Sequence, residues 1–170
     1  SDWTTRPRMM AFRAVGASSN LAGSIHTNMT RLNWINCKRG VFLVNVLGIV
    51  YNPKTKKILI GKRENDPYVK ELNWSFPGGR LTYEESLEKS LIREVKIKTG
   101  VKVNVKDLIL ARIPTENKQF LLLYYFCETS QTKIKAGEKF VEVKWIKPSD
   151  VKKYFTTSIH PKLLAFLKKL

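Results

Sequence analysis

Acidic residues, cysteines and histidines are all scarce in this chain of 170 residues, and each shortage narrows the functions open to it. The 14 Asp and Glu residues stand against 31 Lys and Arg residues, which gives a formal net charge of +17 at pH 7. A surface this basic suits nucleic-acid binding or the attraction of a polyphosphate substrate. The lysines are scattered and form no long block, so a solvated basic surface without a partner is a third interpretation.

Cysteine is rare, and long apolar runs are missing. The two cysteines, Cys37 and Cys127, lie far apart and show no spacing typical of metal ligands. We therefore expect reduced thiols in a cytoplasmic protein, with no disulfide framework. No apolar run reaches the roughly 18 residues needed to cross a bilayer, so we expect no membrane-spanning segment. Of the two histidines, His26 lies near the N-terminus and His160 near the C-terminus.

The first 28 residues differ from the rest of the chain. They hold three arginines and one acidic residue and show no apolar period. We interpret residues 1–28 as an added or mis-started N-terminal extension, with a weak targeting segment as the alternative. Residues 29–170 contain no repeat and no linker, and their number suits one domain with a core of its own.

Strands and helices alternate over the remaining residues. Apolar runs predict strands at 40–51, 57–62, 101–113, 119–128 and 140–146, the first two joined by a turn at 52–56. Helical patterns follow at 85–98, after Pro148 and from Pro161. This order predicts an α/β fold in which helices cover both faces of a mixed sheet, an α/β/α sandwich.

The most informative stretch is a Pro-Gly-Gly turn followed by the helix expected at 85–98. The turn glycines permit unusual backbone angles and a close approach to a ligand. The helix carries an apolar stripe with a spacing of four, made of Leu87, Leu91 and Val95. Thr82, three residues before Glu85, predicts a capping box at the helix start. Acidic residues in such a position are suited to hold Mg²⁺ against a diphosphate.

This stretch resembles the signature of the Nudix hydrolases: a Gly, a Glu six residues on, Arg-Glu eight further, and a closing Gly with an apolar residue. These positions are filled by Gly79, Glu85, Arg93, Glu94, Val95, Gly100 and Val101. The resemblance covers about residues 40–170. It implies a Nudix-type sandwich, and hydrolysis of a nucleoside diphosphate linked to another moiety, with Mg²⁺ or Mn²⁺ as cofactor. The family's metal-binding Glu-Glu pair is replaced by Ile97 and Lys98, so we expect the metal to bind weakly, if at all.

Within the family, the nearest pattern is that of the GDP-mannose mannosyl hydrolases. The shared elements are Ile60-Gly61-Lys62-Arg63, Asn65, Pro67 and the segment from Trp74 to Arg80. This resemblance implies a nucleotide sugar as substrate and His160 as the general base. The alternative is a catalytically impaired Nudix-fold protein that binds nucleotide or RNA, which the missing Glu pair and the charge of +17 favour. Many Nudix proteins are dimers, so a homodimer is possible.

The resemblance also implies roles for single residues. The metal would be held by the Gly78 carbonyl and Glu94, with Glu138 as a later acidic ligand. Glu94 would share catalysis with His160 and Arg63. Glu94 has a second interpretation, however, as the ion-pair partner of Lys98 one turn along the helix.

The basic residues and the remaining signature positions complete the candidate site. Arg63 and Arg80 are expected to clamp substrate phosphates, unless they are plain surface arginines. Lys98 would repel Mg²⁺ and contact a phosphate directly in its place. Arg93 is expected to bond to Glu85 and so hold the loop on the helix. Gly79 and Gly100 shape the two ends of this loop-helix unit.

Overall fold

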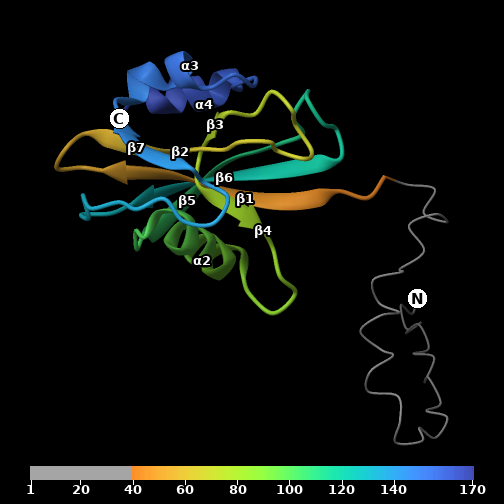
Figure 1. Cartoon of the computed structure of the whole chain (residues 1–170), viewed down its shortest axis with the longest axis horizontal. Helices are drawn as coiled ribbons and strands as arrows, with labels where there is room; N and C mark the ends of the chain where they lie inside the picture. Colours follow the sequence, from red (N-terminus) through yellow and green to blue (C-terminus); the bar gives the residue numbers. More distant parts are fainter. Residues whose placement is uncertain (1–39) are drawn as a thin grey trace, which may run out of the picture. The chain divides into compact units, whose positions relative to one another are not determined.

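One mixed sheet with helices on both faces makes up residues 40–170, the part of the chain that our computed structural model describes (Figure 1). The expected extension, residues 1–28, and Cys37 lie outside these residues. The strands are β1 (Leu43–Asn52), β2 (Lys57–Lys62), β3 (Trp74–Ser75), β4 (Gly78–Arg80), β5 (Asn104–Arg112), β6 (Phe120–Glu128) and β7 (Glu142–Ile146). The helices are α2 (Leu87–Thr99), the 3₁₀ turn η2 (Pro148–Asp150), α3 (Val151–Tyr154) and α4 (Pro161–Leu167).

The sheet is built around β1 and β6. These two strands pair in parallel, from Leu43 against Phe120 to Tyr51 against Glu128. The strand order is β3-β2-β1-β6-β5, with β4 also paired to β1 and β7 to β2, and every pair except β1 with β6 is antiparallel. The aromatic-rich run at 119–128 is therefore a central strand, as its composition predicts, and the hairpin of β1 and β2 is also confirmed.

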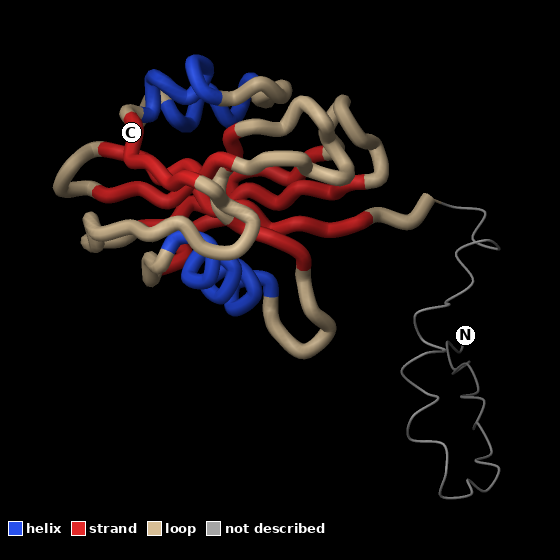
Figure 2. Tube along the Cα trace, viewed as in Figure 1, coloured by secondary structure: helices blue, strands red, loops and turns tan. Residues whose placement is uncertain are grey.

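Helices lie on both faces of the sheet (Figure 2), and each face has its own apolar core. On one face, Leu91 and Val95 of α2 are fully buried against residues of β1 and β2. On the other face, Leu163 and Leu167 of α4 pack with Ile49, Ile60 and Phe76, among others. These two layers confirm the α/β/α sandwich. No helix in residues 40–170 is long and apolar enough to cross a membrane.

Several element boundaries differ from the predictions, and β1 and β5, for example, begin at Leu43 and Asn104 instead of 40 and 101. Helix α2 begins at Leu87 and is capped by Ser86, whose hydroxyl accepts from the Lys89 N–H at 3.3 Å. The capping box expected from Thr82 and Glu85 is therefore wrong, because the Glu85 carboxylate turns toward α2 and accepts from Ser90. Strand β7 begins at Glu142 instead of 140. The helix end is confirmed, since Gly100 adopts a left-handed φ of 73°.

Cys127 lies in β6 and is completely buried, and burial raises the pKa of its thiol to about 12. We expect native protein to resist alkylation at Cys127 at neutral pH, because only the thiolate reacts. Peptide mapping by mass spectrometry after iodoacetamide treatment measures this directly. Alkylation should appear once denaturant unfolds the domain, and rapid labelling of the native protein would contradict the burial.

Candidate functional site

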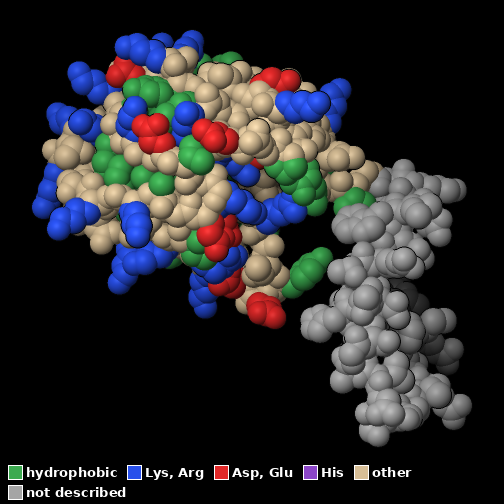
Figure 3. All heavy atoms as spheres, in the orientation of Figure 1, with side chains coloured by type: hydrophobic (Ala, Val, Ile, Leu, Met, Phe, Trp, Pro, Cys, Tyr) green, Lys and Arg blue, Asp and Glu red, His purple; other side chains and the backbone are tan. Residues whose placement is uncertain are grey.

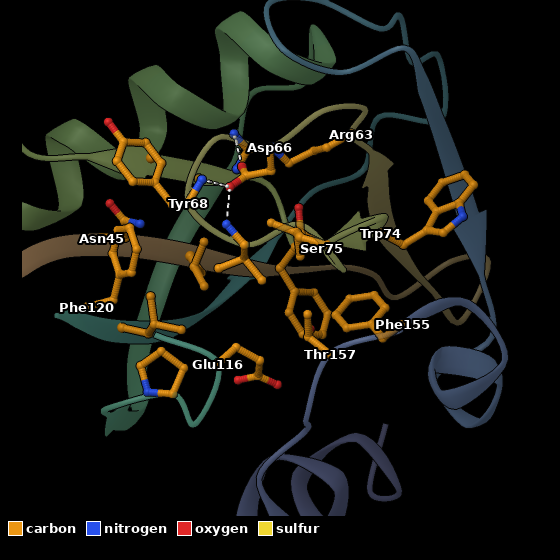
Figure 4. A pocket seen from close by; sticks show the side chains of 18 of the residues that line it. Asn45, Arg63, Asp66, Tyr68, Trp74, Ser75, Glu116, Phe120, Phe155 and Thr157 are labelled. Atoms are coloured by element: carbon orange, nitrogen blue, oxygen red, sulfur yellow. Dashed lines mark hydrogen bonds and ion pairs between the residues drawn. The ribbon is translucent and has the colours of Figure 1, made fainter. Parts of the chain in front are cut away.

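A cleft of about 370 Å³ opens beside the Pro-Gly-Gly turn (Figure 4). Side chains of β1, β6 and α2 line it, together with the turn itself and parts of four loops, at 63–72, 114–116, 139–140 and 155–159. The candidate site thus gathers residues from the whole length of the described chain. The lining combines aromatic rings with charged side chains.

The aromatic part of the cleft includes Tyr68 and Phe120. Their rings meet edge to face with centroids 5.7 Å apart, and the Arg80 guanidinium lies 4.6 Å from the Tyr68 centroid. Asn45 lies nearby on β1, and its side-chain oxygen is buried without a hydrogen-bond partner in residues 40–170. Flat aromatic faces next to an unpaired amide suit a planar, hydrogen-bonding ring such as a nucleobase.

Asp66 fixes the loop that forms one wall of the cleft. Its carboxylate lies 2.8 Å from the Arg63 guanidinium, and it accepts from the backbone N–H groups of Tyr68 and Val69, each at 3.0 Å (Figure 4). Asp66 is 8% exposed, so these bonds are shielded from solvent. Arg63 therefore lines the cleft as expected, but its partner Asp66 was not predicted to belong to the site.

The two turn glycines allow the loop to approach both β1 and α2. Gly78 has a φ of 156°, and a Cβ there would collide with the Val46 carbonyl of β1. A Cβ on Gly79 would collide with the Glu94 carboxylate of α2. Only glycine permits both approaches without displacement. The turn is consequently pressed against Glu94, the acidic residue expected to bind metal.

Lys98 contacts Gly78 in the turn and Glu94 in α2, two of the residues expected to hold the metal. Its Nζ lies 2.9 Å from a Glu94 carboxylate oxygen and donates to the Gly78 carbonyl. The Lys98 side chain is only 8% exposed. The other Glu94 oxygen accepts from Arg93 at 2.5 Å. Of the two interpretations of Glu94, the ion pair with Lys98 is therefore the one that the structure contains.

The charge states of Glu94 and Lys98 depend on their burial and on the charged groups around them. Burial by itself raises the pKa of Glu94, but the hydrogen bonds and charges of Lys98 and Arg93 outweigh it and hold that pKa below its usual range. The pKa of Lys98 lies below its usual value. Burial is the main cause, the charges of Arg63 and Lys139 add to it, and the contact with Glu94 offsets only part of it. Glu94 is thus ionised at neutral pH and surrounded by cations.

Arg93 joins the loop before α2 to the helix. Its Nε lies 2.9 Å from the Glu85 carboxylate, and the hydroxyl of Ser90 donates to the same oxygen at 3.1 Å. The hydrogen bond from Arg93 is the main cause that lowers the pKa of Glu85. The contact expected between these two residues is therefore present, and Arg93 also reaches Glu94.

The donor set does not fit a divalent cation. Mg²⁺ requires several hard oxygen ligands, and carboxylates supply most of their charge. Of the three expected ligands, Gly78 and Glu94 meet at Lys98, whereas Glu138 is exposed and does not line the cleft. In the described part of the chain, no three His, Cys, Asp or Glu side chains lie close enough together to hold an ion. Weak metal binding stays a prediction.

His160 lies at the N-terminus of α4. Its Nδ1 accepts from the backbone N–H of Lys162 at 3.1 Å, which makes it the N-cap of this helix. Its neighbours Ser158 and Ile159 line the cleft, but His160 is not one of the lining residues. Its role as a base stays a prediction.

Glu116 is a cleft residue that no sequence pattern selects. It comes from the loop between β5 and β6, accepts from the Ser158 backbone N–H and lies 3.8 Å from Arg112. Burial raises the pKa of Glu116, but the hydrogen bonds from Ser158 outweigh this and hold it below its usual range. Because no motif surrounds this residue, only the folded loop brings its carboxylate to the cleft.

Positive charge prevails along the cleft. The cationic lining residues are Arg63, Arg80, Lys98, Arg112 and Lys139, against Asp66, Glu94 and Glu116 on the acidic side. All three acids have a basic partner within the domain. The excess favours an anionic ligand.

Comparisons with known proteins identify relatives of this chain. The NUDIX domain family matches residues 41–167. The chain is 30% identical over 125 residues to the 8-oxo-dGTP diphosphatase of Buchnera aphidicola, which covers 74% of this chain and 92% of that protein.

Solved structures show the same fold. A NUDIX hydrolase from Nitrosomonas europaea has a TM-score of 0.64 at 19% identity, with 77% of this chain and 73% of that chain covered. The NUDIX domain of Shewanella oneidensis NrtR, complexed with ADP ribose, has a TM-score of 0.60 at 19% identity, with 85% and 96% covered.

Proposed function

We propose that this chain, which belongs to the Nudix hydrolase family, hydrolyses a nucleoside diphosphate linked to another moiety, and that this moiety is a sugar, as in GDP-mannose. The observation that carries the proposal is a cleft whose lining combines aromatic rings with an excess of cationic side chains. The rings suit the base, and the cationic side chains suit the diphosphate.

The size and lining of the cleft support a ligand with these two ends. Tyr68 and Phe120 offer ring surfaces, and the unpaired Asn45 amide offers a hydrogen-bonding edge for the base. Arg80 lies over Tyr68 and is exposed, so its guanidinium is available to a phosphate next to a base bound there. Lys98 and Lys139 line the same cleft and add positive charge.

Two hydrolytic reactions of a nucleotide sugar are compatible with this cleft. Water can add to a phosphorus atom and break its bond to the bridging oxygen, which yields a nucleoside monophosphate and a sugar phosphate. Water can instead add to the sugar carbon and break its bond to the phosphate oxygen, which yields a nucleoside diphosphate and a free sugar. In either case a base accepts the proton from the attacking water. The resemblance to the mannosyl hydrolases favours the second reaction, with His160 as base.

The substrate proposal is tested by product analysis over a panel of GDP-mannose, ADP-ribose and 8-oxo-dGTP, with Mg²⁺ or Mn²⁺ and with EDTA. Chromatography separates the nucleotide products, and an enzymatic assay detects free sugar. We expect GDP-mannose to give the fastest turnover. Faster turnover of ADP-ribose or 8-oxo-dGTP would reject the mannose assignment and leave the hydrolase proposal standing.

His160→Asn is the sharpest variant for the base. Asn also serves as a good helix N-cap, so the change removes the imidazole but keeps an acceptor for the Lys162 N–H. We expect a loss of about 100-fold or more in kcat, the usual worth of a general base, with an unchanged melting temperature. Retained activity would exclude His160 as the base and direct attention to Glu116.

A binding protein without catalysis is the second candidate function. It is favoured by the Lys98 ammonium on Glu94, and by the Lys and Arg side chains spread over the visible surface (Figure 3). Under this proposal, nucleotide or RNA binds and no product forms with any metal. Fluorescence anisotropy with labelled RNA tests whether the protein binds RNA, and the salt dependence of the affinity measures the phosphate contacts.

Homodimer formation stays a prediction, and sedimentation analysis tests it.

A further inference from the structure

We propose that the Lys98 ammonium is a built-in cation at the diphosphate site, so that the cleft binds a diphosphate group without a divalent metal ion. The inference rests on the proposed function in one respect, the presence of a diphosphate in the ligand. It starts from the disagreement between this site and the metal that the family implies.

The position of Lys98 is the first argument. Its Nζ contacts the Gly78 carbonyl and a Glu94 oxygen, the two groups expected to hold the metal. A divalent ion would have to displace the ammonium from both and then lie beside it. The repulsion between these charges is large in a cleft where water screens little. The ammonium therefore occupies the point where a metal would act.

The hydrogen-bonding capacity of Lys98 is the second argument. An ammonium group has three N–H donors, and two acceptors are recorded for Lys98 among the described residues. Lys98 also lines the cleft, although its side chain is only 8% exposed. One donor is thus left for a ligand oxygen at the cleft surface. A hydrogen bond from an ammonium to a phosphate oxygen is charge-assisted and strong.

The surrounding charges are the third argument. Glu94 compensates the Lys98 charge, but Arg93 already contacts the other oxygen of the same carboxylate. Arg63 and Lys139 line the same cleft as Lys98 and add two further positive charges. The group as a whole carries more positive than negative charge, which an incoming diphosphate neutralises.

Calorimetric titration with inorganic pyrophosphate tests the inference without relying on catalysis. The wild type should bind pyrophosphate in EDTA with an affinity within about threefold of that in millimolar MgCl₂. Lys98→Gln should weaken binding in EDTA by about tenfold or more, the usual effect of one charge-assisted hydrogen bond. Lys96→Gln is the matched control, because it removes the same charge from an exposed position of the same helix and should change binding less than twofold.

A second measurement separates a direct contact from a structural role. In Lys98→Gln, Glu94 and Gly78 lose the ammonium, so added Mg²⁺ should restore part of the pyrophosphate affinity. If Lys98 served only to hold the turn, Mg²⁺ would have no such effect. Circular dichroism confirms that the variant is folded, and Lys98→Arg, which keeps the charge, should retain most of the binding if Lys98→Gln is unstable.

The outcomes distinguish this inference from the proposed function. Pyrophosphate binding that requires Mg²⁺ in the wild type, or that is equal in Lys98→Gln and wild type, would overturn the inference, even if nucleotides are hydrolysed. Lys98-dependent binding in EDTA without hydrolysis of any nucleotide would overturn the proposed function and support the inference.

Discussion

The double substitution Ile97→Glu, Lys98→Glu should turn the cluster of Gly78, Glu94 and residue 98 into a site that binds Mg²⁺. The change removes one positive charge and adds two carboxylates next to Glu94 and the Gly78 carbonyl. We expect the affinity for Mg²⁺ to rise by about 100-fold or more, since hard cations follow the number of carboxylate ligands. Any hydrolysis of nucleoside diphosphate derivatives should then increase when Mg²⁺ is added.

Calorimetry with MgCl₂ measures the affinity, and thermal unfolding supplies an independent reading. Without metal, Glu94 in the double variant lies next to two further carboxylates, at positions 97 and 98. The melting temperature of the variant should therefore fall below that of the wild type. Saturating Mg²⁺ should raise it again, because a ligand bound only to the folded state stabilises that state. Lys96→Glu is the control, an exposed site on the same helix. Tight Mg²⁺ binding by the wild type would show that the chain uses ligands outside this cluster.

Gly78→Ala should be among the most destabilising single changes in the domain. The φ of 156° is one that residues with a Cβ rarely adopt, and the added methyl group would collide with the Val46 carbonyl and the Leu47 Cα of β1. Relief would require β4 to separate from β1, where Gly78 pairs with Leu47. We expect a loss of about 3 kcal/mol, the upper part of the range for backbone strain. For a domain of this size, that lowers the melting temperature by about 6–12 °C.

Gly40→Ala is the matched control for this substitution. Gly40 is exposed, and a Cβ there would meet no atom within 4 Å. Its melting temperature should equal that of wild type within about 1 °C. Gly78→Ala should also weaken pyrophosphate binding in the protein that stays folded, because the Gly78 carbonyl positions Lys98. If both variants melt together with the wild type, the turn is less constrained than the contacts indicate.

The sequence was sufficient for the fold because its apolar patterns are regular and local. The apolar stripe of Leu91 and Val95 predicted helix α2, and the aromatic run of β6 predicted a central strand. The helix start was misplaced because two residues, Thr82 and Ser86, are both suitable N-caps. The bond between Glu85 and Arg93 was expected, but the sequence alone does not say that Ser90 will also donate to this carboxylate and that the cap will be left to Ser86.

Apart from Arg63, the candidate site was predictable only where it coincides with the turn-helix motif. Gly78, Glu94 and Lys98 belong to that motif, and the pairing of Glu94 with Lys98 follows from their spacing of four residues on a helix. Asn45, Tyr68 and Glu116 come from separate segments that contain no motif. Their approach depends on the parallel pairing of β1 with β6 and on loop conformations, which residue spacing does not encode.

The bonds around Asp66 have a consequence for the thermodynamics of ligand binding. Arg63 and two backbone N–H groups hold this wall of the cleft before any ligand arrives. Ordering this loop therefore costs little of the free energy of ligand binding, because the loop already lost its conformational entropy when the domain folded. The free and liganded forms should then differ little along 63–69, and rigid docking against the free structure is justified for this wall.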